Sequence, residues 1–511
     1  MEKRVTFRVN DPKLQKMFDA AEKTAMVNLD TIGDYRVMTE GTLYYPNVWP
    51  ETQPMAGEMY AKRDVEIGIN NCMIFIDHQR EDGRLPGMIS RGDSGPVPHY
   101  GWMQGFYFAM PALKMYYHAD LGDTYLQKLY NCLKRFDEYL WKHRDSDGDG
   151  CLESWCRWDT GEDESTRYGD AENSCEGETP PVGKHTVPME SMDYMAYSYA
   201  NRDVLSRISV LLKNGEEGMW KERAREVSEK IRTYLWREEK HACYDRDADN
   251  RFIEILSHNT LRVMYFGALG QKEADAFMRE HLCNPDEFWT KMPLPSIAVN
   301  DPAFRNDIEN DWSGQPESLT YQRAIAALGN YGHYAELVLL GKKFLHAVSE
   351  TCAFTQQFDP FTGGQPWAER AGFTTYGPAI ITALEYVAQL YGVVPEPFGM
   401  VFTAAGEKDF QSEYTQEYKG KVYGLSAAGG EAVAYVDGRE VFRVKGQCRI
   451  VTDFFGKVKK LIGISPEPCS ILLQRGKETC TVELAPNRQA EIQADGSIHT
   501  TQFEFSCLKE L

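Results

Sequence analysis

Apolar residues recur at helical spacing through most of the chain, from about residue 12 to residue 393. The clearest stripe consists of Leu126, Leu129, Leu133, Phe136 and Leu140. Spacings of three and four residues place such side chains on one face of an α-helix. This period is the strongest constraint on the fold, because it predicts a mainly helical architecture for this whole stretch.

The helical stretches come in pairs that are joined by short turns. One pair covers 204–211 and 220–235, with Asn214, Gly215 and Gly218 in its turn, and a second pair covers 321–328 and 334–348. An open solenoid of helix pairs would show a sequence repeat of fixed length, and this chain shows none. We therefore predict a closed (α/α)6 toroid of helical hairpins.

The period changes after Pro395 and Pro397. Residues 432–436 and 439–444 flank Asp437–Gly438, which is typical of a tight β-hairpin. Further short strands are expected at 448–455, 460–464, 470–473 and 479–484, and at 490–494 and 497–505 around a second turn, Asp495–Gly496. We predict a helical domain at 1–395 and a C-terminal all-β, sandwich-like accessory domain at 396–511.

Charge and composition exclude several classes of partner. The formal charge is −20 and the pI is about 5.1, which disfavours nucleic acids and anionic membranes. No stretch approaches the roughly 18 consecutive apolar residues of a membrane span, and the first residues lack a secretory signal. The 12 cysteines form no pattern. We expect a cytoplasmic protein without disulfides, of undetermined oligomeric state.

Four loops concentrate carboxylates, glycines and aromatic residues between helices. They surround Trp49 and Glu51, and cover 144–169, 306–323 and 354–367. Cleavage of a glycosidic bond needs one acid to protonate the leaving oxygen and a second group to activate water. From the pattern alone, solvated acidic loops explain these segments equally well.

Five motifs in order resemble glycoside hydrolase family 63, which includes processing α-glucosidases and mannosylglycerate hydrolases and is related to trehalase. They are HQREDGRLPGMI (78–89), RDSDGDGCLE (144–153), GEDESTRY (161–168), FDPFTGG (358–364) and RAGFTTYGPAIITAL (370–384). The resemblance implies an (α/α)6 glycosidase of carbohydrate metabolism. It also implies an inverting hydrolase that cleaves an α-glycosidic bond in a short oligosaccharide or a small glycoside.

The resemblance also suggests which residues act. It places the general acid on Asp163, but the position of the family's general base carries Gln356, whose amide cannot take a proton from water. Either a nearby carboxylate replaces the base, with Glu317 preferred over Asp359, or phosphate is the nucleophile, as in a glycoside phosphorylase, or the protein binds sugars without cleaving them. The remaining expected sugar contacts are Trp49, Glu51, Trp102, Arg167, Trp312 and Trp367, besides Gln356. Lys62, Arg63 and the backbone of Gly363 and Gly364 are the candidates for holding phosphate.

Asp145, Asp147 and Asp149 open a D-x-D-x-D-G pattern, which is typical of a calcium loop. The twelfth position is Cys156 instead of a bidentate glutamate, so a structural turn is favoured over calcium. The histidines show no paired spacing typical of zinc ligands. We therefore expect neither a metal nor another cofactor.

Overall fold

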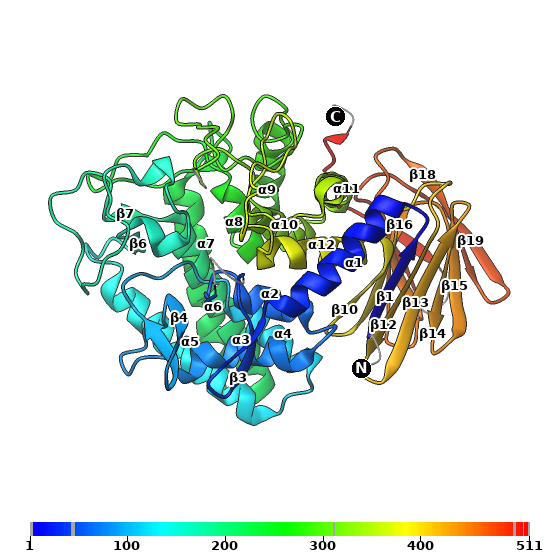
Figure 1. Cartoon of the computed structure of the whole chain (residues 1–511), viewed down its shortest axis with the longest axis horizontal. Coiled ribbons are helices and arrows are strands. Elements are labelled where there is room, and N and C mark those ends of the chain that lie inside the picture. Colours follow the sequence, from blue (N-terminus) through cyan, green and yellow to red (C-terminus); the bar gives the residue numbers. More distant parts are fainter. Residues whose placement is uncertain (1–3, 42–45, 310–311, 494–496, 504, 509–511) are drawn as a thin grey trace. The chain divides into compact units, whose positions relative to one another are not determined.

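The computed structural model describes the chain except for residues 1–3, 42–45, 310–311, 494–496, 504 and 509–511. The chain forms two compact units (Figure 1). The sheet unit comprises Met1–Met26, Ala324–Phe354 and Ile380–Leu511, and the helical unit comprises Val27–Arg323 and Thr355–Ala379. Each unit is therefore assembled from stretches that lie far apart in the sequence.

Several helices of the helical unit pack on the next helix in the sequence, and some also pack on the next helix but one. The helices of this unit are α2 (Gln53–Tyr60), α3 (Val65–Asp77), α4 (Ala109–His118), α5 (Asp123–His143), α6 (Met192–Leu212), α7 (Glu217–Lys230), α8 (Asn259–Phe266) and α9 (Gln271–Phe277), and α10 (Ser318–Asn330) begins in this unit. α2 packs on α3, and α6 packs on both α5 and α7. α6 and α7 confirm the first predicted hairpin. Its turn holds Asn214 and Gly215, whereas Gly218 lies inside α7.

Helix α5 shows how the sequence pattern produces the packing. Its predicted apolar stripe, Leu126, Leu129, Leu133, Phe136 and Leu140, is fully buried. Asp123 stands in the first turn, and Lys142 and His143 stand in the last turn. These charges match the positive N-terminal and negative C-terminal ends of the helix dipole, so they stabilise both ends.

Short strand pairs shape the connections between these helices. They are β2 (Leu29–Ile32) with β3 (Tyr35–Met38), β4 (Met88–Gly92) with β5 (Gly95–His99), β6 (Glu153–Ser154) with β7 (Met189–Glu190), and β8 (Trp236–Arg237) with β9 (Ala242–Cys243). The long loops therefore carry backbone hydrogen bonds of their own, which hold their side chains in defined places.

The sheet unit contains two antiparallel sheets and helices α1 (Pro12–Val27), α11 (Tyr334–Thr351) and most of α12 (Gly377–Tyr391). One sheet has the order β1 (Val5–Val9), β12 (Ser412–Tyr418), β13 (Lys421–Ala428), β14 (Glu431–Val436), β15 (Arg439–Lys445), β18 (Cys469–Arg475) and β19 (Glu478–Leu484). The other has the order β10 (Val393–Glu396), β11 (Gly399–Ala404), β16 (Cys448–Thr452), β17 (Val458–Gly463), β20 (Gln489–Ile492) and β21 (Ile498–Thr501). Phe402 of one sheet packs on Phe442 of the other, with ring centroids 5.3 Å apart. This inward packing is typical of a sandwich.

The predicted hairpin at Asp437–Gly438 is confirmed. Val436 pairs with Arg439, and Asp437 and Gly438 have φ angles of 50° and 74°. Two positive φ angles in a two-residue loop are typical of the type I′ turn, whose twist matches that of the strands. The second predicted turn, Asp495–Gly496, lies outside the described residues.

The sequence predicted a β domain confined to 396–511, but one strand of the β part lies near residue 5. Strand β1 pairs with β12, from Val5 opposite Gln416 to Val9 opposite Ser412. The buried residues Val5 and Phe7 alternate with more exposed ones, so this strand has the pattern of a half-buried sheet. The C-terminal strands also begin slightly earlier than predicted, at Val393.

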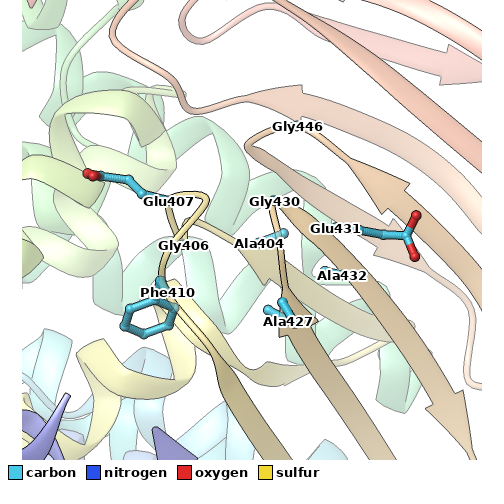
Figure 2. A pocket seen from close by; sticks show the side chains of 10 residues that line it. Ala404, Gly406, Glu407, Phe410, Ala427, Gly430, Glu431, Ala432 and Gly446 are labelled. Carbon is cyan, nitrogen blue, oxygen red and sulfur yellow. The ribbon is translucent and has the colours of Figure 1, made fainter. Parts of the chain in front are cut away.

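The sheet unit contains a small hollow. It lies near Ala404 and Ala427 and, at about 10 Å³, has room for about one water molecule (Figure 2). Figure 2 shows the side chains of Glu407 and Glu431 pointing away from each other, so no carboxylate pair forms there. Among the described residues, no helix is long and apolar enough to span a bilayer.

Candidate active site

A cavity of about 210 Å³ opens within the helical unit. Its walls are four tryptophans, three carboxylates, two amides and three further residues: Trp49, Trp102, Trp158, Trp312, Glu40, Glu51, Asp163, Gln104, Gln356, Met88, Gly161 and Tyr376. Most of these residues come from loops that precede helices: before α2, α4, α6, α10 and α12. The cavity therefore combines flat apolar faces with groups that can exchange protons.

Six of the residues predicted from the sequence line this cavity. They are Trp49, Glu51, Trp102, Asp163, Trp312 and Gln356. The other wall residues were not predicted as site residues from the sequence: Glu40, Met88, Gln104, Trp158, Gly161 and Tyr376. Indole rings line several sides: Trp102 lies 6.4 Å from Trp49 and 5.2 Å from Trp158 between ring centroids.

Glu51 is held by hydrogen bonds from two sides. Arg323 donates to its Oε1 at 2.6 Å, and Gln104 donates to its Oε2 at 3.1 Å. Burial raises the pKa of Glu51, while the guanidinium groups of Arg323 and Arg262 act in the opposite direction. The carboxylate is therefore fixed in place and partly neutralised by arginine.

Gly161 allows the loop of Asp163 to approach Glu51. Its φ angle is +69°, and a Cβ atom built on it would lie 2.1 Å from Oε2 of Glu51. A side chain at this position would overlap the carboxylate, and the backbone conformation itself favours glycine. Close contact between the two acidic loops therefore requires glycine here.

Glu40 is buried, and both its backbone N–H and its backbone carbonyl form hydrogen bonds. Its N–H donates to the carbonyl of Asn47 at 3.2 Å, and its carbonyl accepts from Gly377 at 2.5 Å. Burial raises the pKa of Glu40 well above its usual range, and the charges of Glu51 and Asp163 raise it further. A hydrogen bond with the Tyr376 side chain and the charge of Arg323 oppose this shift.

A buried ion pair and its hydrogen bonds connect two loops of the cavity wall. Asp159 pairs with Arg144 at 2.6 Å, and both side chains are fully buried. The Asp159 carboxylate also accepts from the N–H groups of Met103 at 3.0 Å and Trp155 at 2.8 Å. This buried ion pair fixes the loop of Trp102 and Gln104 against the loop that carries Trp158 and Asp163.

Arg167 does not line the cavity, contrary to the role expected for it as a sugar contact. It is buried and forms ion pairs with Glu162, Asp193 and Asp245. Asn259 also donates to Glu162 and to Asp193, at 3.0 Å each. Since Glu162 precedes Asp163 in the chain, this network holds the backbone of the candidate acid.

Two carboxyl groups of this network, Glu162 and Asp245, have very different pKa values. Burial alone would raise the pKa of Glu162, but Arg167 and Arg262 outweigh it and hold the value at about 2. Burial raises the pKa of Asp245 to about 6, against the opposing charge of Arg167. Glu162 therefore stays charged at every pH in which the protein is expected to work.

Glu317 and Trp367 are also absent from the walls that the structure describes. Glu317 is 0% exposed, and its backbone bridges to Gln357. Trp367 is buried, and its ring packs 4.9 Å from the ring of Phe373. Both residues are therefore outside the set of residues that line this cavity.

A cavity lined by several carboxylates can supply the two acidic groups that glycoside hydrolases use. The sequence model of the mannosylglycerate hydrolase MGH1-like glycoside hydrolase domain matches residues 45–376. The chain belongs to this family and is a glycosidase that acts on a carbohydrate.

Solved structures share the fold at low sequence identity. A GH63 mannosylglycerate hydrolase from Thermus thermophilus superposes with a TM-score of 0.60 and 18% identity, over 73% of this chain and 100% of that chain. Neutral trehalase Nth1 from Saccharomyces cerevisiae gives 0.54 and 13%, over 72% and 80%. An α-L-rhamnosidase from Streptomyces avermitilis gives 0.53 and 11%, over 95% and 42%. The family resemblance read from the sequence is confirmed.

Proposed function

We propose that this glycosidase hydrolyses an α-glycosidic bond in a short oligosaccharide or small glycoside, with inversion, on an (α/α)6 toroid. The observation that carries the proposal is the cavity that Asp163 and Glu40 line together with four tryptophans. Its 210 Å³ is smaller than the roughly 300–1,000 Å³ of pockets for drug-sized ligands. One sugar ring suits this volume better than a long chain does.

Different observations support the individual parts of this proposal. The α-linkage, the inversion and the role of Asp163 as general acid rest on the resemblance to family 63. The preference for one sugar ring rests on the cavity itself. Asp163 sits beside Gly161 on a loop that the buried Glu162–Arg167 network anchors, which suits a group whose proton must be placed accurately.

Water is favoured over phosphate as the nucleophile. Among the described residues that line the cavity, three are carboxylates and none is a lysine or arginine. Lys62, Arg63, Gly363 and Gly364, considered from the sequence as phosphate ligands, are not among these residues. A dianion entering this cavity would meet the carboxylates of its wall with no cation among the described lining residues to bind it, and such repulsion costs free energy in a buried site.

The proposal is tested with a panel of aryl α-glucosides, α-mannosides, α-galactosides and α-rhamnosides, each with and without inorganic phosphate. We expect hydrolysis of one of these classes at a rate that phosphate does not change. Proton NMR at early times should show the β-anomer of the released sugar. Accumulation of a sugar 1-phosphate would identify a phosphorylase instead, and an initial α-anomer would identify a retaining mechanism.

We further propose that the loop at Asp145–Glu153 binds calcium, the alternative that the sequence had made second to a structural turn. Ligand oxygens of Asp145, Asp147 and Asp149 lie within 4.8 Å of one another, and so do those of Asp147, Glu153 and Glu190. Glu190 is 6% exposed, and its side chain is hydrogen-bonded to the Cys151 thiol, which is a weak donor. Glu190, from strand β7, can supply the carboxylate that Cys156 cannot.

Calcium should therefore raise the melting temperature, and a chelator should lower it. Binding to the folded state alone contributes about 2.7 kcal/mol when calcium is a hundredfold above Kd. The Lys230 ammonium lies 3.3 Å from the Asp149 carboxylate and already offsets part of its negative charge. We therefore choose Glu190→Gln as the test variant instead of a change at Asp149. We expect this variant to lose the calcium response in differential scanning fluorimetry. An unchanged melting temperature of the wild type in millimolar calcium and in EDTA would remove the site.

A further inference from the structure

The proposed hydrolysis leaves one role without a residue. Water can attack the anomeric carbon only if a nearby base takes its proton. Gln356 lines the cavity at the position where the family's base is expected, but a side-chain amide does not accept protons near neutral pH. Glu317, the substitute expected from the sequence, does not line the cavity.

Three carboxylates of the cavity wall remain as candidates. Asp163 is already the expected proton donor, and one group cannot donate and accept in the same step. Glu51 receives hydrogen bonds from Arg323 and from Gln104, one on each of its oxygens. Both of its oxygens are therefore already engaged by side-chain donors, which hold the carboxylate in place.

Glu40 differs from Glu51 in its surroundings. The cavity that it lines also contains Gln356 and Tyr376, and Glu40 interacts electrostatically with Asp163. Its backbone is fixed by Asn47 on one side and Gly377 on the other, so the carboxylate is held on a rigid support. Like Asp163, it belongs to a loop and not to a helix, and the two loops approach the cavity from different parts of the chain.

We propose that Glu40 is the general base that activates water in this enzyme. The inference rests on the proposed hydrolytic function. The Glu40 carboxylate accepts a proton from water as the water oxygen bonds to the anomeric carbon. The bond from that carbon to the glycosidic oxygen breaks, and the leaving oxygen takes the proton of Asp163. Solvent then returns a proton to Asp163 and removes one from Glu40, so charge and protons balance.

Gln356 and Tyr376 have supporting roles in this arrangement. The amide of Gln356 can donate to the attacking water or to a sugar hydroxyl and accept from another, which places the water without deprotonating it. The Tyr376 hydroxyl donates to the Glu40 carboxylate and favours its charged form. Glutamine at position 356 is then compatible with catalysis, because the proton acceptor has moved to another loop.

The charged neighbours of Glu40 determine how kcat/KM should depend on pH. Glu51 is a negative neighbour, Asp163 is negative only when it has lost its proton, Arg323 is a cation, and Tyr376 donates a hydrogen bond. The balance raises the pKa of Glu40, so it must lose its own proton before it can act. The acidic limb of the kcat/KM profile should therefore lie above pH 4.5, and Glu51→Gln should move it to lower pH.

The decisive experiment compares Glu40→Gln with Asp163→Asn on two substrates: an aryl glycoside with an activated leaving group and the corresponding alkyl glycoside. A general acid matters little when the leaving group is good, whereas the base is needed for both. We expect Glu40→Gln to lose about 10²–10⁴-fold in kcat on both substrates. Asp163→Asn should lose activity mainly on the alkyl glycoside.

Two further measurements separate catalysis from structural damage. The melting temperature and the affinity for the released sugar should stay near wild type in Glu40→Gln. Azide, a nucleophile that needs no base, should restore turnover and yield a glycosyl azide. Near-normal kcat in Glu40→Gln, or loss of activity in Glu317→Gln alone, would overturn the assignment. A wild type that hydrolyses no glycoside would instead overturn the proposed function, and the inference with it.

Discussion

Replacing Asp163 by asparagine is expected to lower kcat on an unactivated glycoside by about 10²–10⁴-fold. The asparagine has nearly the same shape but carries no proton that it can donate. Asp163 lines the cavity from a loop, and its neighbour Glu162 is held by Arg167, so the fold should tolerate the change. Initial rates and thermal unfolding of the purified variant test both parts.

The matched control for this experiment is Glu164→Gln. Glu164 lies one residue away, its side chain is 52% exposed, and it is not among the cavity residues. We expect this variant to keep the wild-type rate. If Asp163→Asn cleaves alkyl glycosides at a normal rate while remaining folded, Asp163 has no part in proton donation.

Arg167→Met is expected to destabilise the protein more than any other change considered. Methionine fills a similar volume but leaves Glu162, Asp193 and Asp245 buried beside one another without this cation. Breaking a buried ion pair by removing one partner costs about 3–5 kcal/mol, and here one arginine serves three carboxylates. Urea unfolding at pH 7 should show a loss of at least this size, or no folded protein.

The pH dependence of this loss has a definite sign. In the wild type the pKa of Glu162 is about 2, below its unfolded value of 4.5. Its stabilising contribution is therefore fully present above pH 4.5 and is lost as the pH falls toward 2. Without Arg167 the buried carboxyl groups take up protons more readily, so the difference between variant and wild type should shrink from pH 7 to pH 4.

An exposed arginine supplies the comparison for Arg167. Arg225 on helix α7 pairs with Glu222 and Glu229, and its side chain is 58% exposed. Exposed pairs contribute about 0–1 kcal/mol, so Arg225→Met should change stability little. Equal losses in the two variants would show that burial is not what makes Arg167 important.

The helices and most strands of this fold were predictable because their signals are local. Leu126 to Leu140 in α5 and the Asp437–Gly438 turn are patterns of a few neighbouring residues, and both were confirmed. Strand β1 was missed although Val5, Phe7 and Val9 alternate with polar residues. A five-residue strand at the start of the chain gives no indication of its partner when that partner is near residue 416.

The candidate site was predicted where a motif carried it and missed elsewhere. Asp163 and Gln356 came from family motifs and do line the cavity. Glu40 stands in a segment without any motif, so no sequence signal distinguishes it from a surface carboxylate. Arg167 has a residue type suited to a sugar site, but the same type also suits the buried ion-pair network in which the structure places it. Only the contacts of each side chain separate the two.

The pairing of β1 with β12 has a consequence for synthesis of the protein. Val5 leaves the ribosome long before its partner Gln416 does. At about 5–20 residues per second, the first strand waits for roughly 20–80 seconds with its backbone groups unpaired. The sheet unit cannot be completed until its last strand, β21 (Ile498–Thr501), has been made, whereas the helical unit draws on no residue beyond 379. The nascent chain therefore carries an apolar edge that must avoid other chains until the partner strand β12 has emerged.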